Sequence, residues 1–161
     1  MSVQRRAPFF VDQRLNYGRR EIAEFLSAIA PFQTVLDVGS GHGDDLLSAA
    51  RAVPQARLVA LENNPTYARE LELRGMDVHR VNIESDRFPV DDESVDVVVA
   101  NQVMEHVKEV FWILDQVSRC LRVGGHLIVG VRSAEPRVAS QPHPAPCWPP
   151  TYGHPELLRA H

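Results

Sequence analysis

The chain has 161 residues, a length that suits one domain with one hydrophobic core. Its residues are 44% apolar and 24% charged, as in ordinary globular proteins, and no apolar run approaches the roughly 20 residues that span a bilayer. The net charge of −4 argues against a general polyanion binder. Two cysteines are too few for a disulfide framework, and the first residues make a poor signal peptide, so we expect a cytoplasmic setting.

The expected elements alternate between helix and strand. Apolar residues at three- and four-residue steps predict a first helix from Arg19 to Ala30, which Pro31 ends. Short apolar runs with β-branched residues then predict buried strands over residues 34–38, 57–61, 77–81, 95–100 and 126–131. Further helices are predicted over residues 44–52, 65–74 and 107–121. This order is typical of an α/β fold in which helices cover both faces of a parallel sheet.

The chain changes character after Val131. Residues 133–161 contain seven of the twelve prolines and keep no helical or strand period. Such a segment buries too little apolar surface to offset its ordering entropy, so we expect it to be irregular. The sequence therefore predicts a core domain over residues 1–132, followed by a proline-rich tail over 133–161.

A glycine-rich loop lies between the first predicted strand and the next helix, in VLDVGSGHGDD at residues 35–45. Glycines let the backbone turn sharply and let a ligand approach it closely. The spacing is not the dinucleotide fingerprint, because the third glycine comes one residue early and Asp44 takes its place, where a carboxylate would repel a pyrophosphate. No Lys-Ser/Thr pair follows, as a phosphate loop would need. The loop is predicted to hold a ligand without phosphate, and S-adenosyl-L-methionine (SAM) fits.

Two acidic residues flank this loop. Asp37 lies near the end of the first strand, where its carboxylate can bond backbone amides of the turn and organise the loop beside a cationic ligand. Glu62 ends the second strand, 19 residues after Gly43, and an acid there can accept hydrogen bonds from both hydroxyls of a ribose. Asp44 and Asp45 are interpreted as partners of the helix dipole.

Four segments in this order resemble the class I SAM-dependent methyltransferases, within the broad group that includes quinone-biosynthesis and sugar- or lipid-modifying enzymes. The segments are VLDVGSGHG (35–43), Glu62, FPVDDESVDVVVANQVMEHV (88–107) and LRVGGHLIVGV (121–131). The resemblance implies a Rossmann-like doubly wound sheet with core strand order 3-2-1-4-5, SAM as cofactor and methyl transfer as the activity.

The resemblance also implies roles for single residues. It places Asp37, Gly39, Ser40, Gly41 and Gly43 along the methionine part of SAM. It places Glu62 and Asn63 at the ribose, Asn82 and Ile83 beside the adenine, and Asn101 and Gln102 toward the cofactor and the acceptor. Asn82 stands where the family usually has an acid, and an amide carbonyl still bonds the adenine amino group. Tyr17 and Arg20 match loosely the residues that close over SAM.

His106 is the candidate general base for the reaction. The methyl group on a sulfonium is already activated, so the protein needs to align the acceptor, exclude water and remove a proton where the acceptor carries one. His106 follows the fourth strand, and histidine is the side chain that most often serves as a general base. The chain lacks the sequence signatures of nucleic-acid methyltransferases, and its composition supplies no strong basic stripe. We therefore expect a small-molecule, glycan or lipid-linked acceptor. No metal site is expected, since His143, Cys147 and His154 lack ligand spacing.

Three interpretations stay open at this stage. Family members normally continue past the fifth strand with two more strands, and the proline-rich tail stands in their place. The chain is then an active methyltransferase, with a homodimer as one way to complete its site, or a truncated SAM-binding module without turnover. A weaker third interpretation is an enzyme that uses NAD.

Overall fold

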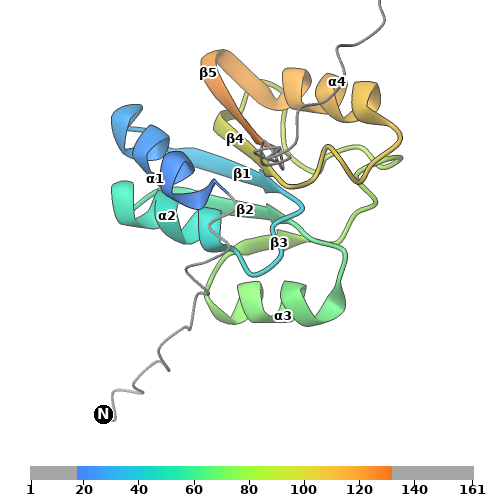
Figure 1. The fold of residues 1–161 in the computed structure, drawn as a ribbon, viewed down its shortest axis with the longest axis horizontal. Coiled ribbons are helices and arrows are strands. Elements are labelled where there is room, and N and C mark those ends of the chain that lie inside the picture. Colours follow the sequence, from blue (N-terminus) through green and yellow to red (C-terminus); the bar gives the residue numbers. More distant parts are fainter. Residues whose placement is uncertain (1–17, 132–161) are drawn as a thin grey trace, which may run out of the picture.

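A five-stranded parallel sheet forms the centre of the molecule, and its strand order is β3-β2-β1-β4-β5 (Figure 1). The computed structural model describes residues 18–131, so Tyr17 and the tail at 133–161 lie outside the described residues. The strands are β1 (Thr34–Val38), β2 (Arg57–Leu61), β3 (Asp77–His79), β4 (Val95–Asn101) and β5 (Leu121–Gly130). This topology confirms the expected Rossmann-like fold and its core strand order.

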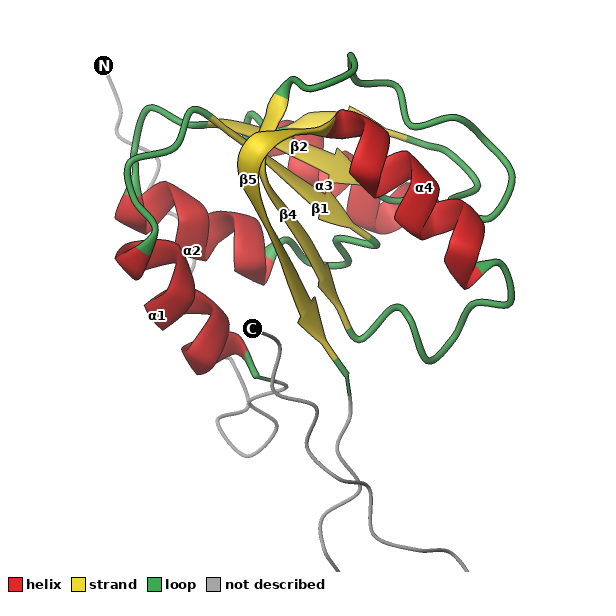
Figure 2. Ribbon diagram, turned by 90° about the horizontal axis from the view of Figure 1, so that it is seen from above, coloured by secondary structure: helices red, strands yellow, loops and turns green. Residues whose placement is uncertain are grey.

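Four helices connect or precede the strands. They are α1 (Arg19–Ala28), α2 (Asp44–Ala52), α3 (Pro65–Leu73) and α4 (Val110–Cys120). The helices α1 and α2 lie together on one side of the sheet, and α4 lies on the other (Figure 2). Since β1 and β4 are covered on both faces, their side chains are almost all buried, which explains why they read as continuous apolar runs.

Each face of the sheet has its own apolar core. Ile22 and Leu26 of α1 and Leu46 of α2 pack on one face. Ile113 and Val117 of α4 pack on the other, together with Phe88 from the loop before β4. The helices and the sheet together remove these side chains from water. This packing fixes the position of the sheet edge that carries the predicted site.

Several element boundaries differ from the expectation, and α1, for example, ends at Ala28 rather than at Ala30. The helix α4 begins at Val110 rather than at residue 107, and the strand β3 ends at His79 rather than at 81. The strand β5 begins at Leu121, but its register with β4 shifts between Val95 and Val97, where Gly124 has a φ of 79°. The glycine pair therefore forms an irregularity inside β5 instead of a turn that precedes it.

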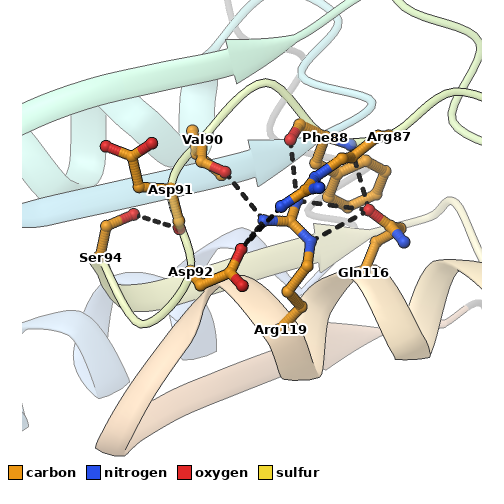
Figure 3. A network of polar contacts seen from close by, with 8 residues as sticks. All are labelled: Arg87, Phe88, Val90, Asp91, Asp92, Ser94, Gln116 and Arg119. Carbon is orange, nitrogen blue, oxygen red and sulfur yellow. Dashed lines mark hydrogen bonds and ion pairs between the residues drawn. The ribbon is translucent and has the colours of Figure 1, made fainter.

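Arg119 of α4 fastens the loop before β4 to the helix (Figure 3). Its guanidinium donates to the carbonyl oxygens of Phe88 at 2.8 Å and Val90 at 3.0 Å, and to the Asp92 carboxylate at 2.6 Å. The Gln116 side chain accepts from the Phe88 N–H at 3.2 Å, so the segment is held from two turns of α4. A guanidinium with several fixed acceptors orders an otherwise irregular loop.

Candidate functional site

A cavity of about 450 Å³ opens at the carboxyl ends of β1 and β4. Ligands of doubly wound sheets bind at this edge, where the strand order reverses. The volume lies in the range of about 300–1,000 Å³ that small-molecule sites usually have. The lining residues are Arg19, Asp37, Gly39, Ser40, Gly41, His42, Asp44, Asp45, Tyr67, Asn101, Gln102, Glu105 and His106.

The glycine loop forms one wall of this cavity. The N–H groups of Gly39 and Ser40 both donate to the Leu61 carbonyl oxygen, at 2.9 and 3.2 Å. Gly41 has a φ of 51°, and a Cβ added there would meet nothing within 4 Å. The loop is thus fixed from behind by β2, while the backbone at Gly41 faces open space that a ligand can enter.

The other two glycines serve the packing of the protein. A Cβ on Gly39 would lie 2.7 Å from Val103 Cγ2, so the second residue after β4 approaches the loop closely. A Cβ on Gly43 would lie 2.4 Å from Leu71 Cδ2 of α3, and Gly43 does not line the cavity. The expected place of all three glycines along the ligand stays a prediction. Gly39 and Gly41 line the cavity, while the missing side chain of Gly43 makes room for α3.

Glu62 lies beside the glycine loop. Its Oε2 accepts from the Gly41 N–H at 2.7 Å, and its Oε1 accepts from the Asn64 N–H at 2.7 Å. The carboxylate thus ties the end of β2 to the loop after β1 and to the start of α3. Glu62 itself does not line the cavity, so its predicted bond to a ribose would share oxygens that already accept from the backbone.

Two buried carboxyl groups lie at the floor of the cavity. Asp37 is 2% exposed and Asp45 is 7% exposed. Burial raises the pKa of Asp37 well above its usual value, and the nearby Asp45 carboxylate raises it further. Burial also raises the pKa of Asp45, although the hydrogen bond from Asn101 and the charge of Arg19 oppose this effect. A cationic ligand would stabilise the ionised form of both groups.

Asn101 ends β4, Gln102 follows it, and both residues line the cavity. The Asn101 side chain donates from Nδ2 to Asp45 Oδ2 at 3.0 Å, while Asn101 Oδ1 and Asp45 Oδ1 are buried and have no hydrogen-bond partner. Gln102 has a φ of 58°, a left-handed conformation that a non-glycine residue rarely adopts, and its N–H donates to the Gly130 carbonyl oxygen at 2.7 Å. Buried acceptors without partners and residues with a strained backbone often occur together in binding sites, and this cavity contains both.

His106, the candidate base, lies at the mouth of the cavity next to Glu105. Both side chains are exposed, and the His106 N–H donates to the Val103 carbonyl oxygen at 2.9 Å. The backbone turn therefore places His106 among the lining residues of the cavity, which the glycine loop also lines.

The residues expected at the adenine lie outside the cavity lining. Asn82 Oδ1 accepts from the Glu84 N–H at 3.1 Å, and the Asn82 N–H donates to Asp86 Oδ2 at 2.8 Å. Ile83 is half-buried and packs against the apolar core on the α4 side. Asn63 is exposed just after β2. These residues follow β2 and β3 at the same edge of the sheet, beyond the cavity rather than inside it.

Sequence reasoning missed several lining residues. His42 packs its ring against Tyr67 of α3, with ring centroids 4.4 Å apart, and its Nδ1 lies 3.5 Å from the Glu70 carboxylate. Asp45 was assigned to the helix dipole alone, yet it contacts Asn101 inside the cavity. Arg19 pairs with Asp44 at 3.1 Å. Among these residues Tyr67 carried a usable signal, because it is an aromatic residue in the first turn of the helix that follows Glu62.

The comparisons with known proteins agree on the class of domain. The model of the methyltransferase domain family matches residues 36–129. An arsenite methyltransferase of Halobacterium salinarum is 36% identical over 110 residues, which cover 64% of this chain and 28% of that protein. The sugar N-methyltransferase KedS8 from Streptoalloteichus has a TM-score of 0.58 at 19% identity, covering 82% of this chain and 57% of that one. Coclaurine N-methyltransferase, solved with S-adenosylhomocysteine (SAH), has a TM-score of 0.60 at 21% identity, covering 75% and 38%.

The chain belongs to the class I SAM-dependent methyltransferase family, and SAM is the cofactor of that family. It spans less than half the length of the curated relatives it matches. No helix within residues 18–131 is long and apolar enough to cross a membrane. The same residues contain no group of three or more His, Cys, Asp or Glu side chains that would hold a metal ion.

The cavity suits the chemistry of SAM. The bare backbone at Gly41 gives a ligand close access to the loop, and the carboxyl groups of Asp37 and Asp45 suit a ligand with a sulfonium and an ammonium group. The unpaired Asp45 Oδ1 offers a buried acceptor to such a cation. Arg19 is the single arginine or lysine among the described lining residues, and it already pairs with Asp44, which argues against a phosphate-bearing cofactor.

Proposed function

We propose that this domain transfers a methyl group from SAM to a small-molecule, glycan or lipid-linked acceptor. The observation that carries the proposal is the cavity itself, which joins the glycine loop, two buried carboxyl groups and an exposed histidine at the carboxyl edge of the sheet. When bound, SAM supplies an activated methyl group on a positively charged sulfur. The protein supplies the alignment, the electrostatic environment and the acceptance of a proton.

In this proposal Asp37, Ser40 and Gly41 hold the methionine part of the cofactor. The buried carboxyl groups of Asp37 and Asp45 favour a cation over a neutral ligand, since burial makes their ionised forms costly until a positive charge arrives. Glu62 keeps the loop in its open shape through its bond to the Gly41 N–H and reaches the ribose from the rim. Asn82 and Ile83 approach the adenine beyond the cavity.

The acceptor enters from the side of Gln102 and His106. The His106 imidazole, exposed at the mouth, takes the proton from an acceptor hydroxyl, amine or activated carbon as the new bond to the methyl group forms. Relatives of this fold include enzymes named for arsenite, for a sugar amine and for coclaurine, so a varied set of compact acceptors fits the same scaffold.

A pair of glycine variants tests the cofactor site. Gly41 and Gly124 both have positive φ, and a Cβ on either would meet nothing within 4 Å. Gly41→Ala and Gly124→Ala should therefore lose similar stability, roughly 1 kcal/mol. We expect calorimetry to show weaker SAH binding for Gly41→Ala alone. Equal SAH affinity of both variants and the original chain would place the cofactor elsewhere.

A histidine pair tests the chemistry. Cell extract is incubated with labelled SAM and either the original chain, His106→Gln, or His126→Gln, whose side chain is exposed on β5 away from the cavity. We expect methyl transfer to fall by about 10²-fold or more for His106→Gln and to be unchanged for His126→Gln. Full transfer by His106→Gln excludes it as the base, and SAM binding without transfer by the original chain favours a binding module.

A further inference from the structure

The loop between β4 and α4, residues 102–109, carries His106 and Gln102 but contains no helix or strand. Two backbone bonds hold its first half: the Gln102 N–H donates to the Gly130 carbonyl oxygen, and the His106 N–H donates to the Val103 carbonyl oxygen. Its second half is held by a side chain from another part of the protein. Glu84 Oε2 accepts from the N–H groups of Lys108 at 2.6 Å and Glu109 at 3.0 Å.

This contact supplies a hydrogen-bond acceptor at the start of α4, where backbone N–H groups lack partners inside the helix. The first N–H groups of a helix have no partner inside it, and a capping side chain usually accepts from them. Glu109, the residue before α4, makes no such side-chain bond. Glu84, 24 and 25 residues away in the chain, accepts from the N–H groups of Lys108 and of Glu109, the residue directly before α4, and brings a negative charge near the positive end of the helix. The two N–H bonds lower the pKa of Glu84, so the carboxylate is ionised at neutral pH.

Glu84 also belongs to the turn that is expected beside the adenine. Its own N–H donates to Asn82 Oδ1, and the N–H groups of Ser85 and Asp86 donate to the Asn82 carbonyl oxygen at 3.1 and 2.8 Å. The turn at residues 82–86 is therefore closed around Asn82. Any ligand that fixes Asn82 and Ile83 also fixes the carboxylate that holds the other loop.

We propose that Glu84 is a positioning residue that couples the adenine side of the cofactor site to the loop carrying His106. The inference rests on the proposed function, since that function places the adenine at Asn82 and Ile83. Cofactor binding orders the 82–86 turn, the Glu84 carboxylate then holds Lys108 and Glu109 more firmly, and the mouth of the cavity takes its working shape. The coupling is reciprocal, so an ordered 102–109 loop also strengthens cofactor binding.

Removal of Glu84 leaves the rest of α4 in place. Arg119 and Gln116 hold the later turns of α4 to the loop at residues 88–92 by bonds that do not involve Glu84 (Figure 3). Ile113 and Val117 are buried against the sheet. A Glu84 variant is therefore expected to fold, and its effect is confined to the loop before α4.

Hydrogen exchange of the full chain, with and without SAH, tests the proposal. The variants are Glu84→Ala and Glu84→Gln, and the control is Glu72→Ala, whose side chain is exposed on α3. Without ligand, we expect the Lys108 and Glu109 amides to exchange about tenfold faster in Glu84→Ala, as loss of a cap predicts. Glu84→Gln keeps one carbonyl acceptor and should rescue part of the protection, while Glu72→Ala should match the original chain.

The measurements with SAH distinguish a failure of the Glu84 coupling from a failure of the proposed function. SAH should slow exchange at Lys108 and Glu109 in the original chain and in Glu72→Ala, but not in Glu84→Ala. If SAH binds and protects these amides equally in Glu84→Ala, the coupling is wrong. If SAH does not bind the original chain, the proposed function is wrong, and the ligand-free exchange rates still decide whether Glu84 holds the loop.

Discussion

Buried aspartates lie at both ends of the same parallel sheet, but their surroundings differ. Asp96, near the amino end of β4, is 5% exposed, and Asp37 and Asp45 at the carboxyl end are 2% and 7% exposed. Asp96 Oδ2 accepts from the N–H groups of Gln33 and Thr34 at 2.8 and 2.7 Å, and its Oδ1 pairs with Arg122 at 2.6 Å. Neither Asp37 nor Asp45 takes part in an ion pair within residues 18–131, and Asp45 Oδ1 has no hydrogen-bond partner.

Since all three residues are equally buried, the difference lies in their partners. A buried carboxylate whose bonds are all supplied by the protein is tolerated in the fold, and removal of one partner from such a group is strongly destabilising. A buried carboxyl group without such partners costs stability, and it persists where a ligand supplies what the protein omits. The partners of Asp96 thus indicate a structural role at the amino edge, and the surroundings of Asp37 and Asp45 agree with the binding role proposed for the carboxyl edge.

The largest expected effect is that of Asp96→Ala, which removes the buried carboxylate at the amino edge of the sheet. Asp96→Ala leaves the N–H groups of Gln33 and Thr34 without their acceptor and Arg122 without its partner. We expect the free energy of unfolding to fall by about 3 kcal/mol, measured by denaturant titration. SAH affinity of the folded variant should stay unchanged. A loss below about 0.5 kcal/mol would show that this aspartate does not stabilise the fold.

Arg119→Met should have the next largest effect. The Arg119 side chain is 17% exposed, and the substitution keeps its apolar stem but removes the donors to Phe88 and Val90. We expect a loss of about 2 kcal/mol in unfolding free energy by the same titration. The change should not alter SAH affinity, because Arg119 does not line the cavity. Weaker SAH binding would extend the functional edge to this loop.

Asp37→Asn, at the carboxyl edge, should change ligand affinity, whereas the two variants above should change the free energy of unfolding. The substitution keeps the shape of the side chain but removes its charge, so a cationic ligand loses more than a neutral one. We expect SAM affinity to fall by about tenfold, or about 1.4 kcal/mol, and SAH affinity to fall less, both by calorimetry. Unchanged SAM affinity, or an equal loss for both ligands, would contradict a charge-based role for Asp37.

The smallest effect is on the pH dependence of stability. Burial raises the pKa of Asp37 in the folded chain, so the folded chain holds this proton after the unfolded chain has released it near pH 4. The contribution of Asp37 to stability is therefore greatest below about pH 4 and declines as pH rises through the raised pKa. Asp37→Asn should gain stability relative to the original chain between pH 5 and pH 8. Parallel stability curves for the two proteins would exclude this effect.

The fold was largely predictable, because buried strands and amphipathic helices leave local patterns. The bounds of β1, α2 and β2 agree with the residue ranges expected from the sequence. The start of α4 at Val110 was not predictable from its neighbours, since Glu84, far away in the chain, holds the N–H groups of the two residues before the helix. The irregularity in β5 also depends on pairing with β4, which no local pattern records.

The candidate site was predictable only in part. The spacing of Glu62 from the glycines correctly brought it next to Gly41, because the ends of adjacent parallel strands meet at one edge. The burial of Asp45 was not predictable, because its place in the first turn of α2 already had a sufficient local explanation in the helix dipole. Its contact with Asn101 depends on how α2 lies against β4.

The most direct measurement follows the backbone amide resonances of isotope-labelled protein as SAH is added. A second cavity, of about 580 Å³, lies at the amino edge and is lined by Pro31, Phe32, Gln33, Gln55, Asp96 and Arg122. The account predicts that SAH shifts the resonances of Gly41 and Asn101 and leaves those of Gln33 and Arg122 unchanged. Shifts confined to the amino-edge cavity, or none at saturating SAH, would contradict it.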